Sequence, residues 1–204
     1  MEDIVRLFMI RHGETIQNRD EIIQGHSLGS LSDKGREQAA KAALRLKSER
    51  FDCIYVSDLK RTVETSEEIL RFHNGVPVFY DSRIREQNLG VFEGKSFATL
   101  RDEIKRQETD FLHFKPPGGE SVEDLSRRTT NFYQLICKKH PKETVLLITH
   151  GGVIITMLLH IFDWSSSRYR EALPENTAVS VIDIDSDGTP NAVILNSVEH
   201  LGLA

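Results

Sequence analysis

Apolar positions along the chain follow two kinds of pattern. Four continuous apolar runs are rich in β-branched residues: Val5–Ile10, Cys53–Val56, Val76–Tyr80 and Val145–Thr149. Such runs are typical of strands that are buried on both faces of a sheet. Between the runs, apolar residues recur three or four positions apart in segments that end near Leu46, Phe72 and Lys139. This alternation predicts an α/β fold with a mainly parallel sheet covered by helices on both faces.

Local signals refine these elements. Ser32 or Asp33 suits the N-cap of the first long helix, and Ser121 with Asp124 resembles a capping box. The apolar run Val153–Phe162 is too short to span a bilayer and predicts a buried helix. Close to the C-terminus, a turn sequence separates two further apolar runs, Ala178–Ile184 and Ala192–Asn196. This pattern predicts a hairpin that closes one edge of the sheet.

Composition narrows the class of protein. The 204 residues are 39% hydrophobic and 28% charged, without a linker-like stretch, which predicts a single domain over residues 1–204. A net charge of -5 argues against a nucleic-acid or anionic-membrane partner. The two cysteines, Cys53 and Cys137, lack the spacing of a disulfide scaffold or a zinc motif. With no secretory signal pattern at the N-terminus, these features predict a cytoplasmic protein.

Chemically active residues follow three of the predicted strands. Arg11-His12-Gly13 ends the first, His150 with Gly151 ends the last, and Arg61 comes shortly after another. Because the carboxyl ends of parallel strands open on one edge, these side chains are expected to converge there. Arginines can grip a phosphoryl group in two places, and a histidine between cations is held neutral and nucleophilic. His12 or His150 could attack phosphorus, whereas Arg61 could instead pair with Glu64 along its helix.

The sequence resembles the histidine phosphatase superfamily, in the branch that contains phosphoglycerate mutases and broad-specificity phosphatases. The matching residues run in order along nearly the whole chain: Arg11-His12-Gly13-Glu14-Thr15 with Asn18, Gln24-Gly25, Leu31-Ser32 with Gly35, Ser57-Asp58-Leu59 with Arg61-Thr62, Arg85-Glu86, Glu93-Gly94, Pro117-Gly118-Gly119-Glu120-Ser121 and Thr149-His150-Gly151. The resemblance implies a three-layer sandwich with a mixed sheet, in agreement with the periodicity.

The resemblance also implies roles for individual residues. His12 would be the nucleophile, and the phosphoryl group would be bound by Arg11, Arg61 and His150. Glu86 matches the proton donor of the family. Substrate binding is expected at Asn18, Gln24, Gly25 and Gly151. Glu93, the rival carboxylate, is interpreted as a solvated loop residue, and Glu14 as a residue that serves structure near the site.

Neither a metal nor another cofactor is expected, because arginines supply the positive charge that magnesium supplies in many phosphoryl-transfer sites. The expected partner is a small phosphorylated metabolite. Glu86 is not followed by the basic, aromatic stretch that the mutases share, and the region 95–117, a predicted small helical cap, is short. Hydrolysis is therefore favoured over a cofactor-dependent phosphoglycerate mutase, and a non-catalytic phospholigand-binding module is a third alternative. Pairing of two chains through the C-terminal hairpin to form a homodimer is an alternative that the sequence does not decide.

Overall fold

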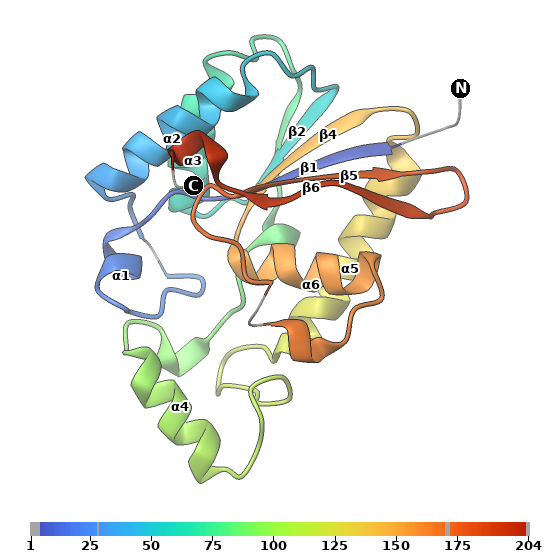
Figure 1. The fold of residues 1–204 in the computed structure, drawn as a ribbon. Helices are drawn as coiled ribbons and strands as arrows, with labels where there is room; N and C mark the ends of the chain where they lie inside the picture. The colour runs from blue at the N-terminus through green and yellow to red at the C-terminus, as the bar shows by residue number, and fades with distance from the viewer. Residues whose placement is uncertain (1–4, 28, 170–171, 203–204) are drawn as a thin grey trace.

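A six-stranded sheet forms the centre of the computed structural model, which describes residues 5–27, 29–169 and 172–202 (Figure 1). The strands are β1 (Val5–Arg11), β2 (Cys53–Val56), β3 (Val78–Tyr80), β4 (Thr144–Thr149), β5 (Val179–Ile184) and β6 (Pro190–Ser197), in the order β3-β2-β4-β1-β5-β6. The first four strands pair in parallel, and β5 is antiparallel to both of its neighbours, β1 and β6. The sheet is therefore mixed and mainly parallel, which confirms the predicted class.

Helices cover both faces of this sheet. One face carries α2 (Asp33–Leu46) and α3 (Lys60–Leu70), and the other carries α5 (Val122–Lys139) and α6 (Gly151–Ile161), as Figure 1 shows. Side chains of β4 alternate between the two layers: Val145 and Leu147 pack with α5 and α6, whereas Leu146 and Ile148 pack with α2 and α3. All four are fully buried, as a continuous apolar run predicts for a strand inside a three-layer sandwich.

The prediction of two-sided burial is wrong for the run that ends at Tyr80. This strand, β3, is short, and 40% of Phe79 and 56% of Tyr80 are exposed. It lies at the edge of the sheet and pairs with β2 alone. Apolar content does not distinguish an edge strand from a central one, because the difference lies in what the rest of the chain places beside it.

The local signals are confirmed. The hydroxyl of Ser32 accepts from the backbone N–H of Gly35 at 3.0 Å, which makes Ser32 the N-cap of α2. Ser121 and Asp124 form a reciprocal capping box at the start of α5. The C-terminal hairpin closes one edge of the sheet, and the apolar run after Gly152 is the buried helix α6. Among the described residues, no helix combines the length and the apolarity needed to cross a bilayer.

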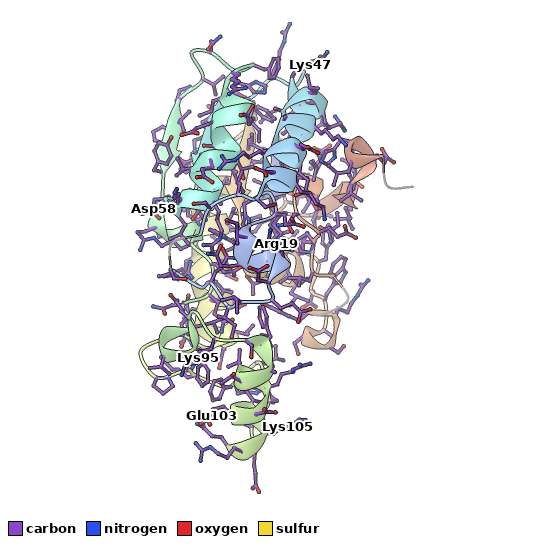
Figure 2. The ribbon with its side chains drawn as sticks, turned by 90° about the vertical axis from the view of Figure 1, so that its left-hand side faces the viewer. Arg19, Lys47, Asp58, Lys95, Glu103 and Lys105 are labelled. Atoms are coloured by element: carbon purple, nitrogen blue, oxygen red, sulfur yellow. The ribbon has the colours of Figure 1, made fainter. Side chains whose placement is uncertain are left out.

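A small helical region lies beside the sandwich. It contains α4 (Phe97–Arg106), and its apolar residues form a cluster of their own: Ile23, Leu89, Phe92, Leu100, Ile104 and Phe114. In Figure 2, α4 carries Glu103 and Lys105 away from the main body, and Arg19 on the short helix α1 (Ile16–Arg19) lies between α4 and the α2–α3 layer. The cluster attaches this region next to the carboxyl ends of the parallel strands.

Candidate active site

The carboxyl ends of the parallel strands meet at a pocket of about 170 Å³. Arg11 is the last residue of β1, and His12 follows it. Arg61 lies in the first turn of α3, which comes after β2, and His150 and Gly151 connect β4 to α6. Eight of the nine candidate residues line this pocket: Arg11, His12, Asn18, Gln24, Gly25, Arg61, Glu86 and Gly151. The exception, His150, is fully buried and does not line the pocket. Side chains far apart in sequence are therefore neighbours, as the shared edge of parallel strands requires.

His12 presents one ring nitrogen for chemistry. The side chain is 3% exposed, and Nδ1 lies 2.8 Å from the carbonyl oxygen of Gly13. Because a carbonyl can only accept, Nδ1 carries the proton and the lone pair of the neutral ring is on Nε2. Nε of Arg61 donates to this nitrogen at 3.3 Å. Burial, followed by the charges of Arg61 and Arg11, holds the pKa of His12 well below its usual range.

His150 supports His12 rather than lining the pocket. It is fully buried, and the centroid of its ring is 5.2 Å from that of His12. Its Nε2 bonds to the hydroxyl of Ser57 at 2.8 Å, whereas Nδ1 has no partner among the described residues. Burial is again the largest cause that lowers the pKa of His150 far below its ordinary value. Its predicted contact with a phosphoryl group stays a prediction.

These lowered pKa values predict a measurable titration order. At pH 6.5, where an ordinary imidazole is about half protonated, His12 and His150 should be neutral. Exposed His113 serves as the internal control, because the carboxylate of Asp110 raises its pKa. In an NMR titration, the two buried imidazoles should titrate only well below pH 6.5 and His113 above it. A His12 resonance that titrates at or above pH 6.5 in the free protein would contradict this electrostatic account.

Two buried arginines supply the positive charge. Arg61 is 1% exposed and donates to the carbonyls of Gly25 at 2.8 Å and Ser27 at 3.4 Å. Burial lowers its pKa to about 10, so it is still protonated at neutral pH. Nη1 of Arg11 donates to the carbonyl of Pro174 at 2.7 Å, and its buried Nε has no partner among the described residues. Such a donor suits an anion in the pocket.

The alternative in which Arg61 pairs with Glu64 is wrong. The carboxylate of Glu64 lies 3.7 Å from Nζ of Lys60 and accepts from the backbone N–H of Leu31 at 2.7 Å. Position 61 instead directs its guanidinium inward from the first turn of α3, toward His12. Helical spacing alone could not separate these outcomes, because both Lys60 and Arg61 are close to Glu64 along the sequence.

The loop after α1 depends on a carboxylate that the sequence interpretation placed in solvent. Oε1 of Glu93 accepts from the backbone N–H of His26 at 2.8 Å and from that of Leu89 at 3.2 Å. Gly25 has a φ of +54°, and a Cβ there would lie 2.1 Å from the same carboxylate. Glu93 is therefore a half-buried brace that shapes the pocket at Gly25, and its interpretation as a solvated loop residue is wrong.

The remaining loop residues have distinct positions. Asn18 accepts from the backbone N–H of Thr15 at 3.2 Å while it lines the pocket. Gln24 is buried, and its Oε1 has no partner among the described residues. Glu14 accepts from the hydroxyl of Ser32 at 2.9 Å and pairs with Lys34 at 2.8 Å, which ties β1 to the start of α2. Glu14 thus serves structure, as the sequence interpretation has it.

Glu86 lies against the N-terminus of α6. Its Oε2 accepts from the backbone N–H of Gly152 at 3.2 Å, and its Oε1 accepts from that of Gln87 at 2.8 Å. A Cβ at position 152 would lie 2.3 Å from Oε1, so only glycine allows this approach. The positive end of the helix dipole favours a carboxylate at this place. Gly152 was not among the predicted site residues.

Comparison with known proteins agrees with this arrangement. The family model of the histidine phosphatase superfamily (branch 1) matches residues 7–197. This chain belongs to the histidine phosphatase superfamily. The family resemblance read from the motifs is thereby confirmed.

Relatives in the superfamily carry several names. The chain is 40% identical over 141 residues to the fructose-2,6-bisphosphatase TIGAR of Bos taurus, which covers 67% of this chain and 52% of that protein. It is 32% identical over 209 residues to a broad-specificity phosphatase of Saccharomyces cerevisiae, with 98% and 89% covered. The structure of phosphoserine phosphatase in complex with 3-phosphoglyceric acid from Entamoeba histolytica superposes with a TM-score of 0.83 at 27% identity, over 97% of this chain and 99% of that one. The chain spans about half of the bovine relative's length, and proteins named as phosphoglycerate mutases also match.

In this member of the superfamily, Arg128 holds the backbone of Glu86. Its Nη1 donates to the carbonyls of Arg83 at 2.6 Å and Arg85 at 3.0 Å, and its Nη2 donates to that of Glu86 at 3.4 Å. The guanidinium also bonds to the carboxylate of Glu120 at 2.6 Å. The sequence interpretation missed Arg128, because only the folded chain places α5 beside the segment that carries Glu86.

Replacing Arg128 by methionine should therefore slow turnover without removing a reacting group. We expect kcat to fall about 10- to 100-fold, since small displacements of an acid carry that cost. If Glu86 is the proton donor that the family resemblance implies, the loss should be larger for an alkyl phosphate than for an aryl phosphate, because poor leaving groups depend most on proton donation. Arg127→Met is the matched control, since the exposed Arg127 pairs only with Glu123 and Asp124 of its own helix among the described residues. Equal losses for both substrates would assign Arg128 to stability alone.

The pocket continues outward into a larger cavity of about 830 Å³. Both cavities share walls formed by Phe97, Phe111, Tyr169 and Leu173, and charged residues of both signs, which include Arg101 and Asp110, line the outer one. Two further phenylalanines of this region, at positions 92 and 114, pack against each other in the cluster around α4. The inner end of the site is therefore buried and cationic, and its outer end is mainly apolar and open.

Proposed function

We propose that this chain is a metal-independent phosphatase that hydrolyses small-molecule phosphate monoesters through a phosphohistidine on His12. The observation that carries the proposal is the unprotonated Nε2 of a buried histidine beside the Arg61 guanidinium, in a pocket that Arg11 and Glu86 also line. A neutral imidazole is nucleophilic, and fixed guanidinium groups stabilise the negative charge on the phosphoryl oxygens. A carboxyl group can donate a proton to the leaving oxygen.

The chemistry divides into two displacements. In the first, the Nε2 lone pair of His12 forms a bond to phosphorus while the bond to the ester oxygen breaks. The leaving oxygen takes a proton from the carboxyl group of Glu86, and the alcohol departs. In the second, the Glu86 carboxylate takes a proton from water, whose oxygen attacks phosphohistidine and releases phosphate and free His12. Arg11 and Arg61 hold the phosphoryl oxygens throughout.

Access to water supports hydrolysis over transfer to a second acceptor. The phosphoryl pocket opens into the outer cavity, so water can reach the phosphorylated histidine between the two displacements. The names of the relatives support phosphatase activity in the family, although they differ in substrate. The apolar walls at Phe97, Phe111 and Leu173 favour an ester whose alcohol part is apolar next to the phosphate.

The proposal has a direct test. Purified protein is mixed with a chromogenic aryl phosphate, with and without a chelator, and released phosphate is measured. We expect multiple turnovers and an unchanged rate in chelator, because the cations of the site belong to the chain. Phosphate exchange that requires a bisphosphate and a second acceptor would instead favour a mutase. Loss of activity in chelator, with recovery on added magnesium or zinc, would contradict a metal-independent reaction.

We also propose that residues 1–204 form one catalytic domain, with the region 95–117 as a cap over the substrate's alcohol part. The family model spans residues 7–197, and the apolar cluster of the cap region shares Leu100 with the walls of both cavities. A cytoplasmic setting is supported by the two free cysteines.

A further inference from the structure

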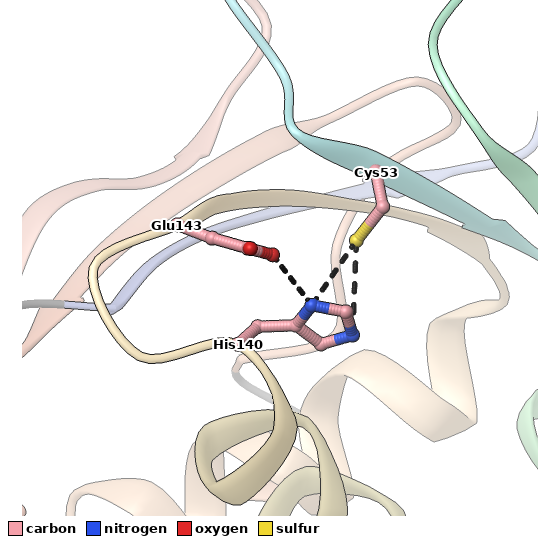
Figure 3. Close-up of side chains that lie close together, drawn as sticks. All are labelled: Cys53, His140 and Glu143. Carbon is pink, nitrogen blue, oxygen red and sulfur yellow. Dashed lines mark hydrogen bonds and ion pairs between the residues drawn. The ribbon is translucent and has the colours of Figure 1, made fainter.

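A second group of reactive side chains lies at the opposite edge of the sheet from His12. Cys53 is the first residue of β2, His140 follows the last residue of α5, and Glu143 directly precedes β4. They are thus at the amino ends of parallel strands whose carboxyl ends form the phosphoryl pocket. Figure 3 shows the three side chains converging between the strand, the end of the helix and the loop that joins α5 to β4.

The distance between Cys53 and His140 matches that between two ligands of one ion, and Glu143 lies beside them. Sγ of Cys53 lies 3.6 Å from Nδ1 of His140, and Oε2 of Glu143 lies 2.7 Å from the same nitrogen. The three ligand atoms are all within 4.8 Å of one another. Around a tetrahedral zinc ion, with bonds of about 2.0–2.3 Å, neighbouring ligand atoms are roughly 3.5 Å apart. A small rotation of the Glu143 side chain, 43% of which is exposed, would supply the remaining adjustment.

The geometry differs from that of a cysteine nucleophile with its base. In such an arrangement the thiol and the carboxylate contact opposite nitrogens of the imidazole, so that a proton can pass through the ring. Here Sγ of Cys53 is 3.6 Å from Nδ1 and 3.8 Å from Nε2 of His140, while Nδ1 contacts the carboxylate of Glu143 and Nε2 is 2.9 Å from the hydroxyl of Tyr55. Because each ring nitrogen is already paired with an oxygen, neither is aimed at the thiol as a base, and the arrangement does not favour nucleophilic catalysis.

Tyr55 completes the surroundings that a histidine ligand needs. Its hydroxyl accepts from Nζ of Lys139 at 2.9 Å and faces Nε2 of His140. In the metal-free structure Nδ1 donates to the carboxylate of Glu143, so an ion that binds Nδ1 has to displace this proton, and Nε2 can then donate to the hydroxyl of Tyr55. Such an outer hydrogen bond commonly fixes the tautomer and the orientation of a metal-bound histidine.

We propose that Cys53, His140 and Glu143 bind one zinc ion, with water as the fourth ligand. Cys53 and His140 are 3% and 6% exposed, so the ion would enter past Glu143. Binding releases the thiol proton of Cys53 to solvent and leaves sulfur bound to zinc. The ion would join β2, the end of α5 and the start of β4, and would take no part in catalysis at the other edge. The spacing of the ligands, 87 residues from Cys53 to His140, explains why the sequence contains no zinc motif.

Cobalt provides the test, because a thiolate bound to Co²⁺ gives a charge-transfer absorption band in the near ultraviolet that imidazole and carboxylate ligands do not give. The protein is stripped with chelator and titrated with Co²⁺, and bound Co²⁺ is then displaced with Zn²⁺. We expect one Co²⁺ per chain, a thiolate band, and loss of that band on addition of one equivalent of Zn²⁺. Stoichiometric binding without a thiolate band, or no binding, would overturn the proposal.

Variants separate ligation from folding. Cys53→Ser should remove the band, and Cys137→Ser is the matched control, since Cys137 is free and is not part of the cluster. Glu143→Gln, at a partly exposed position, should keep the fold and weaken Zn²⁺ binding at least tenfold. Zn²⁺ should raise the melting temperature of the parent protein and of Cys137→Ser, but not that of Cys53→Ser. A band that survives in Cys53→Ser, or equal affinity in Glu143→Gln, would contradict the assignment.

Discussion

Turnover should fall at least about 1000-fold in His12→Ala, and acid-labile phosphate should no longer be incorporated into the protein. The expected size follows from the loss of a nucleophile, which removes the covalent route altogether. The other imidazole of the site cannot replace it, because Nε2 of His150 is bonded to Ser57 and the side chain does not line the pocket. The measurement is steady-state phosphate release together with an alkaline quench after mixing with radiolabelled substrate.

Binding of inorganic phosphate separates this loss from unfolding. Arg11 and Arg61 remain in the variant, so phosphate should still bind and raise its melting temperature. His113→Ala, which removes an exposed imidazole, should retain full activity. If His12→Ala kept substantial turnover, or if the label moved to another residue, the assignment of the nucleophile would be wrong.

The convergence of the site could be predicted from sequence because it depends on topology. Arg11 ends β1 and Gly151 comes shortly after β4, and both strands have clear apolar runs. Parallel pairing places the carboxyl ends of such strands together whatever their separation in sequence. The register places Arg11 directly beside Thr149. Helix starts were equally readable, since Ser121 and Asp124 act within one turn.

Contacts that depend on tertiary packing could not be read from the sequence. Arg128 reaches Glu86 only because α5 lies beside that segment, and Glu93 is a brace only because a loop from elsewhere presents N–H groups to it. The group of Cys53, His140 and Glu143 could not be predicted for the same reason, since Cys53 meets the other two only when β2 and β4 pair. Motif spacing detects local sites, and these three are formed by segments distant in sequence.

Glu86→Gln should slow the hydrolysis of an alkyl phosphate about 100- to 10,000-fold and that of a nitrophenyl phosphate far less. An alkoxide leaves poorly without a proton, whereas nitrophenolate leaves without one, so the size of the effect reports on proton donation. Glutamine preserves the shape, and its one amide oxygen can still accept from one of the two N–H groups, of Gly152 and Gln87, that bond to the carboxylate. The measurement is kcat for both esters in the parent protein and the variant.

Glu93→Gln distinguishes the two carboxylates of the region. Glu93 touches the backbone of His26 and Leu89 and does not line the pocket, so its replacement should slow both esters by a similar factor through the loop at Gly25. An unequal loss confined to Glu86→Gln would place the proton at Glu86. If Glu93→Gln instead slowed the alkyl ester selectively, Glu93 would be the proton donor. The assignment of that role to Glu86 would then be wrong.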